Sequence, residues 1–66
     1  MTKLIKVENG RYTVTDENGT TIALVYRYGN GYTRDIRNAQ TGEFFRPEYF
    51  NYFKTIAEVK RRYGIK

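Results

Sequence analysis

The chain has 66 residues, of which 39% are hydrophobic, carries twelve Lys and Arg against seven Asp and Glu, and contains neither Cys nor His. Without thiol or imidazole it lacks the commonest metal ligands and catalytic bases, and its carboxylates fall in no spacing typical of an acid–base pair or a calcium loop, so we expect no enzyme, no metal and no cofactor. The length predicts one domain, residues 1–66. No apolar run approaches the roughly 20 residues that cross a bilayer, so we expect a cytoplasmic protein without a membrane partner.

Turn signals divide the first two thirds of the chain into short strands. Asn9-Gly10 is typical of a tight hairpin turn, and further glycine-containing turns follow at regular spacing. The alternating segments between them predict strands at Lys3–Glu8, Arg11–Thr15, Thr20–Tyr28, Tyr32–Arg37 and Glu43–Phe45. Connections this short favour neighbouring antiparallel strands, so we expect a meander of four or five strands, the last being a stub that Pro47 ends.

Residues 44–53, FFRPEYFNYF, hold six of the eleven aromatic side chains. Phenylalanine seldom stays exposed, so the segment is expected to close one end of the core. The phenylalanines expected in the core are Phe44, Phe50 and Phe53. Tyr49 and Tyr52 tolerate a wet edge and are predicted to form an aromatic rim available to a partner. Pro47 could also open a short helical turn over residues 48–53, and the sequence leaves this alternative open.

The C-terminal residues predict one helix, at about residues 55–63. Thr55-Ile56-Ala57-Glu58 matches a capping box, and Gly64 is placed to end the helix. An apolar stripe at helical spacing consists of Ile56, Val59 and Tyr63. We expect this stripe to cover one face of the sheet, so the predicted fold class is α+β, an antiparallel meander with one C-terminal helix packed on one face.

The net charge of +5 is concentrated near the C-terminus. Residues 54–66 contain five Lys and Arg against one Glu, whereas residues 1–53 contain seven against six. At about 100° per residue, Arg61 and Arg62 point away from the apolar stripe and Lys60 borders it. Such a basic face can attract phosphates through counterion release, but cations in a last helical turn also complement the helix dipole. Both interpretations stay open.

A sheet covered by a single helix leaves its other face open. Depending on register, that face would mix aromatic rings with some of the strand arginines, Arg11, Arg27, Arg34 and Arg37. Rings stack on bases and guanidinium groups pair with phosphates, so we predict a nucleic-acid-binding module, for DNA or RNA, that uses the basic helix face and the Arg- and Tyr-bearing strands. The alternative is a protein-interaction module that uses the aromatic segment or the exposed sheet.

The stretch YTRDIRNAQTGEFF, residues 32–45, joins an arginine-bearing strand through a polar loop ending in Thr-Gly to a further strand, with the helix following. This order resembles the small sheet-plus-helix DNA-binding domains of the phage integrase arm-binding and plant AP2 type. The resemblance implies a sheet lying in the major groove, with Arg34 and Arg37 nearest the bases or phosphates. The chain departs from it in an extra N-terminal strand and in Asp35, between the two arginines. It is also similar to small phage accessory proteins, which implies a host protein as the alternative partner.

The predicted nucleic-acid contacts are thus Arg34, Arg37, Lys60, Arg61 and Arg62, and the predicted partner-binding aromatic rim is Tyr49 and Tyr52.

Overall fold

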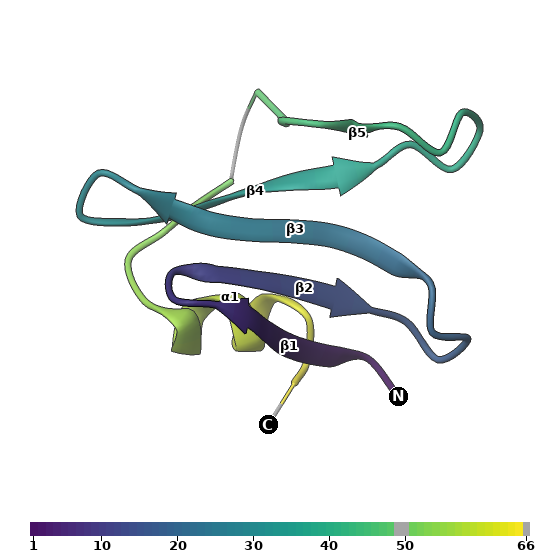
Figure 1. Cartoon of the computed structure of the whole chain (residues 1–66). Coiled ribbons are helices and arrows are strands. Elements are labelled where there is room, and N and C mark those ends of the chain that lie inside the picture. Colours follow the sequence, from purple (N-terminus) through teal and green to yellow (C-terminus); the bar gives the residue numbers. More distant parts are fainter. Residues whose placement is uncertain (49–50, 66) are drawn as a thin grey trace.

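The computed structural model describes residues 1–48 and 51–65, and it shows one sheet with one helix behind it (Figure 1). The elements are β1 (Lys3–Glu8), β2 (Arg11–Thr15), β3 (Thr21–Tyr28), β4 (Gly31–Arg37), β5 (Phe44–Phe45), β6 (Tyr52–Phe53) and α1 (Ile56–Arg62). Strands β1 to β5 lie side by side in chain order, β6 pairs with β4, and every pairing is antiparallel. The predicted α+β meander with a C-terminal helix is confirmed, and its fifth strand is a two-residue stub.

The aromatic segment forms a strand where a helical turn was one of the alternatives. Tyr52 and Phe53 form β6 and pair with Thr33 and Tyr32 of β4, so the helical turn over residues 48–53 is wrong at these two positions. Phe53 is buried as predicted, at 6% exposure. Phe44 is 37% exposed, against prediction, and its pairing with Arg37 places it on the face away from the helix. The predictions for Tyr49 and Phe50 lie outside the described residues.

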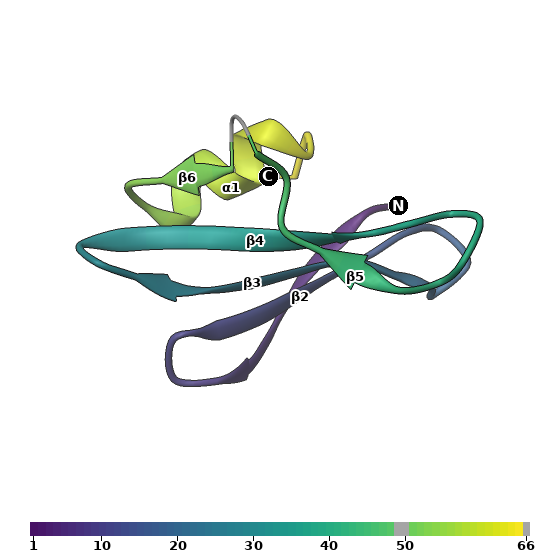
Figure 2. The same cartoon turned by 90° about the horizontal axis from the view of Figure 1, so that it is seen from above.

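The register of the strands decides which side chains the helix covers. Val14 of β2 pairs with Ala23 of β3, and Tyr12 pairs with Val25, so these four share one face. Viewed along the sheet, α1 lies on one side only (Figure 2). The buried hydrophobic residues between sheet and helix are Val14, Ala23, Val25, Phe53 and Val59. The opposite face, called the open face below, carries the other alternating set of β3, namely Leu24, Tyr26 and Tyr28.

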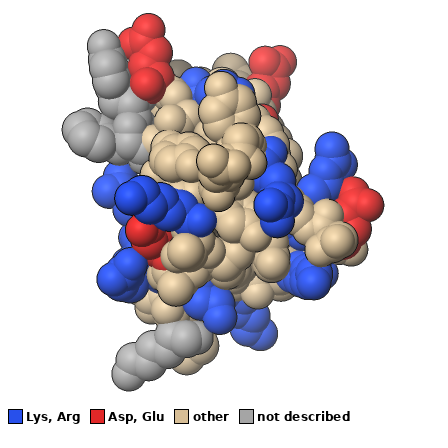
Figure 3. All heavy atoms as spheres, turned by 90° about the vertical axis from the view of Figure 1, so that its left-hand side faces the viewer, with Lys and Arg blue, Asp and Glu red and all other residues tan. Residues whose placement is uncertain are grey.

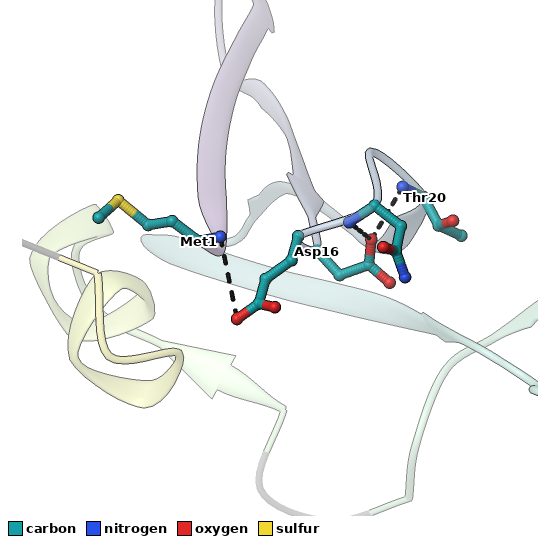
Figure 4. Close-up of polar contacts among 5 residues, drawn as sticks. Met1, Asp16 and Thr20 are labelled. Atoms are coloured by element: carbon teal, nitrogen blue, oxygen red, sulfur yellow. Dashed lines mark hydrogen bonds and ion pairs between the residues drawn. The ribbon is translucent and has the colours of Figure 1, made fainter.

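Side-chain caps hold the turn between β2 and β3 (Figure 4). Oδ1 of Asp16 accepts hydrogen bonds from the backbone N–H groups of Asn18, at 2.9 Å, and Thr20, at 3.0 Å. This is the local side-chain geometry that lets Asp initiate turns. The Met1 amino group lies 3.9 Å from the Glu17 carboxylate, but both groups are exposed and such a pair adds little stability.

The Thr55 half of the predicted capping box and the glycine stop signal are present, but Glu58 accepts from the N–H of Lys54 and not from that of Thr55. Oγ1 of Thr55 accepts from the Glu58 N–H at 3.3 Å, and the Glu58 carboxylate accepts from the Lys54 N–H at 3.0 Å. Gly64 has φ 67° and its N–H donates to the Arg61 carbonyl at 3.2 Å. These start and stop signals fix the ends of α1, and so they fix the positions of the three consecutive cations in its last turn, Lys60, Arg61 and Arg62.

Candidate functional site

Arg34 lies on the helix face of the sheet and not on the open face. The register pairs it with Val25, and it is 8% exposed. Its Nη1 donates to the Tyr63 hydroxyl at 2.6 Å, and its guanidinium carbon lies 5.6 Å from the centroid of the Phe53 ring and 5.4 Å from that of Tyr63. Arg34 thus joins β4 to the helix, and its side chain is covered where the sequence predicted a nucleic-acid contact.

The other predicted basic contacts are separated from one another. Arg37 is exposed at the last position of β4 and pairs with Phe44. Lys60 is half-buried on α1. Arg61 and Arg62 are exposed on the same helix and project away from the core. The structure therefore brings together Arg61 and Arg62, and leaves Arg37 at the far end of β4.

The two helix arginines meet an aromatic side chain at the edge of the sheet. A shallow hollow of about 570 Å³ is lined by Tyr52, Phe53, Glu58, Arg61 and Arg62, and is called the Tyr52 hollow below. Tyr52 is 50% exposed, whereas Phe53 is buried beside it. Neither arginine is ion-paired within residues 1–48 and 51–65. The Glu58 carboxylate, which accepts the Lys54 N–H, also lines the hollow and keeps its charge, so the hollow presents two cations and one carboxylate beside an exposed ring.

A second group of aromatic and basic side chains lies on the open face. The Arg46 guanidinium carbon is 4.8 Å from the centroid of the Tyr28 ring, and Tyr28 is 50% exposed. Beside them, the Tyr26 hydroxyl donates to Oδ1 of Asp35 at 3.1 Å. Hydrogen bonding to the Tyr26 hydroxyl raises the pKa of Arg46 above its ordinary value, so this exposed guanidinium stays charged. Sequence reasoning assigned no role to Arg46, because only the strand register brings it over Tyr28.

The open face also contains an apolar hollow of about 400 Å³ near β1. Its apolar lining includes Val7 and Leu24, and its polar groups include Glu8, Arg11 and Asp35. Arg11 lies 3.4 Å from Glu8 in an ion pair, so its charge is already matched. This apolar hollow therefore suits an apolar side chain better than a phosphate.

Charge on the end of the molecule that carries the β3–β4 turn is unevenly distributed. In this view, Lys and Arg side chains border a largely uncharged centre, and Asp and Glu side chains lie among them at several places on the rim (Figure 3). Rings with cations nearby suit a ligand with flat rings and negative charges.

Comparison with protein-family models, with curated proteins and with solved structures finds no match in any of the three. Within residues 1–48 and 51–65, no three His, Cys, Asp or Glu side chains are grouped so as to hold a metal ion. The helix of that part of the chain is too short and too polar to cross a membrane. The candidate function therefore rests on the geometry of the two hollows and the Tyr28–Arg46 pair.

Proposed function

We propose that the protein is a non-enzymatic module that binds nucleic acid at the Tyr52 hollow. The observation that carries the proposal is the position of the Tyr52 ring beside Arg61 and Arg62, since the sequence separates these side chains by the length of the helix. The ring offers a face on which a base can stack, and the two guanidinium groups can pair with phosphates. Binding of this kind needs no catalytic group and tolerates any base.

Complementation of the helix dipole is the simplest other account of the cations. It is worth about 0.3–1 kcal/mol for each charge in the last turn, and it applies to Arg61 and Arg62 whatever they bind. It does not account for an aromatic ring left half-exposed in the same hollow, because Tyr52 contributes nothing to the dipole. The combination favours a ligand with flat rings and negative charges. For a chain without cysteine, we also propose that this ligand is met in the cytoplasm.

The double variant Arg61→Ala plus Arg62→Ala should weaken binding and reduce its dependence on salt. Removing one arginine–phosphate pair should lower the slope of log K against log salt by about 0.7 for a single strand and about 0.9 for duplex DNA. Fluorescence anisotropy with labelled single-stranded DNA, RNA and duplex DNA at several salt concentrations measures both quantities. We expect a slope reduced by about 1.4 or more for the double variant.

The matched control is Lys3→Ala plus Arg37→Ala, which removes the same charge from the other end of the sheet. Lys3 pairs with Thr15 and Arg37 ends β4, so both lie roughly 20 Å along the strands from the β3–β4 turn, at about 3.3 Å per residue. This control should leave the affinity nearly unchanged. If the two double variants lose affinity equally, binding depends on the overall positive charge and not on the Tyr52 hollow. An absence of binding to every nucleic acid at near-physiological salt would refute the proposal.

A protein partner at the apolar hollow is the second candidate, and the exposure of edge strand β1 favours it. Val7, which lines that hollow, is 61% exposed, and Ile5, which pairs with the lining residue Thr13, is 46% exposed. Exposed apolar side chains next to a free strand edge are typical of peptide-docking surfaces.

Val7→Lys should abolish retention of such a partner and leave nucleic-acid affinity intact, because the charge lies outside the Tyr52 hollow. Affinity capture with the tagged wild-type chain, with Val7→Lys and with the apolar control Val7→Ile compares the three directly. A protein captured by the wild-type and Val7→Ile chains but not by Val7→Lys supports this candidate. Equal capture by all three contradicts it.

A further inference from the structure

Two half-exposed tyrosines flank one glycine at the end of the sheet. The β3–β4 register places Tyr28 directly opposite Gly31, and on the other side of β4 the Tyr52 hydroxyl lies only 2.7 Å from the position that a Cβ on Gly31 would occupy. Both tyrosines are 50% exposed. Gly31 itself is buried, and the Tyr52 hydroxyl and the Phe53 carbonyl oxygen occupy the space that its side chain would fill. Both rings therefore lie beside the same residue of β4.

Arg46 supplies a cation to the Tyr28 ring, as Arg61 and Arg62 do to the Tyr52 ring. Its guanidinium lies 4.8 Å over the Tyr28 ring and is ion-paired with no carboxylate within residues 1–48 and 51–65. The nearby Asp35 carboxylate accepts from Tyr26 instead. A guanidinium plane is itself a surface on which a base can stack, and its edge can pair with a phosphate. The Tyr28–Arg46 pair therefore repeats the ring-plus-cation chemistry of the Tyr52 hollow.

We infer that the ligand is a single strand of nucleic acid, which runs from the Tyr52 hollow to the Tyr28–Arg46 pair. This inference rests on the proposed function and adds to it the strandedness of the ligand and a second contact point. Bases in a duplex are stacked on one another and offer no free face to a side chain, whereas an unpaired strand can place separate bases on separate platforms. Two exposed rings with cations beside them, Tyr52 and Tyr28, suit such a strand.

The inference is tested by measuring how the affinity for a short and a long probe changes when the Tyr28 ring is removed. The short probe is a single labelled thymidine nucleotide, and the long probe is a labelled oligothymidylate of about 12 nucleotides, within the range of site sizes known for single-strand-binding folds. Because Tyr28 and Tyr52 both lie beside Gly31, only a probe with a single base is restricted to one ring at a time, whereas the long probe can reach both. We expect Tyr28→Ala to weaken binding of the long probe about tenfold or more, and to leave binding of the short probe unchanged.

Matched variants separate the ring from the charge. Tyr28→Phe keeps the ring and should bind the long probe as the wild type does. Arg46→Ala should lower the salt slope for the long probe by about 0.7, and leave the slope for the short probe as it is. Since both side chains are exposed, thermal unfolding should show that these variants fold normally.

The outcomes distinguish the inference from the proposed function. Wild-type binding of the long probe that Tyr28→Ala and Arg46→Ala both leave intact would overturn the second contact point, with the Tyr52 hollow still supported. Duplex bound as tightly as single strand would overturn the strandedness alone. A wild-type protein that binds neither probe, and retains a protein partner through Val7 instead, would overturn both.

Discussion

Arg34→Ala should lower the free energy of unfolding by about 2–4 kcal/mol. The side chain is 8% exposed and fills the space between β4 and the helix, where its guanidinium contacts two rings. Truncation opens a cavity, removes both cation–π contacts and deprives the Tyr63 hydroxyl of its donor. Because a chain of this length has only roughly 3–10 kcal/mol of total stability, denaturant titration followed by circular dichroism should show that a large fraction of it is removed.

Arg34→Met is the matched control for this variant. The Arg34 side chain has no carboxylate partner within residues 1–48 and 51–65, and its Nε makes no hydrogen bond, so its burial already carries a desolvation cost. Methionine has similar length, is flexible and removes that cost. We expect Arg34→Met to retain the wild-type stability within about 1 kcal/mol.

The same control decides between a structural role and a binding role for Arg34. If the residue only joins sheet and helix, the folded Arg34→Met protein should bind nucleic acid as the wild type does. Weaker binding at unchanged stability would instead show that Arg34 contacts the nucleic acid, as the resemblance to DNA-binding domains implies. A loss of stability as large as that of Arg34→Ala would show that the charge itself, and not the volume, holds the helix to the sheet.

Features encoded by neighbouring residues were predictable from the sequence. The hairpin at Asn9-Gly10 and the N-cap at Thr55 each need only a few adjacent side chains, and both are present. Strand β6 was not predicted, because two residues show no periodicity. It forms only because β4 leaves part of an edge unpaired beyond β5 and because the bare Gly31 lets the β6 backbone approach.

The inward face of each strand was not predictable from composition, because β3 carries apolar residues on both faces. Ala23 and Val25 face the helix while the larger Leu24 and Tyr26 do not, and a register shifted by one residue would exchange the two sets. One signal was available for the arginines. Arg34 and Arg37 are three residues apart on one strand, so they must face opposite sides of the sheet and could not share a flat ligand surface.

The residues of the Tyr52 hollow could be predicted one by one from the sequence, but their grouping into one site could not. Exposure of Tyr52 and projection of Arg61 and Arg62 from the helix follow from local chemistry, and each was predicted. Their meeting depends on β6 pairing with β4 immediately before the helix begins. No spacing rule within the sequence encodes that pairing, so the hollow emerges only at the level of tertiary structure.

Gly31→Ala should be the most damaging change among the glycines, at about 3 kcal/mol. A Cβ at this position would meet the backbone carbonyl oxygen of Phe53, and would lie 2.7 Å from the Tyr52 hydroxyl. A backbone atom cannot rotate out of the way, so β6 must separate from β4. Because β6 leads directly into the helix, the damage should spread to the packing of Phe53. Denaturant titration gives the size of the loss, and hydrogen exchange of the β6 amides shows its place.

Gly29→Ala, in the turn that precedes β4, is the control. Gly29 has φ 61° and no atom lies within 4 Å of the Cβ position, so alanine there should cost only the backbone strain of about 1–2 kcal/mol. The two variants should also differ in binding. Gly31→Ala displaces Tyr52 and should weaken binding of the short and the long probe alike, whereas Gly29→Ala should weaken neither. Equal stability of the two variants would mean that β6 is not held against β4. Unchanged binding by a destabilised Gly31→Ala protein would mean that the nucleic-acid contacts lie away from Tyr52.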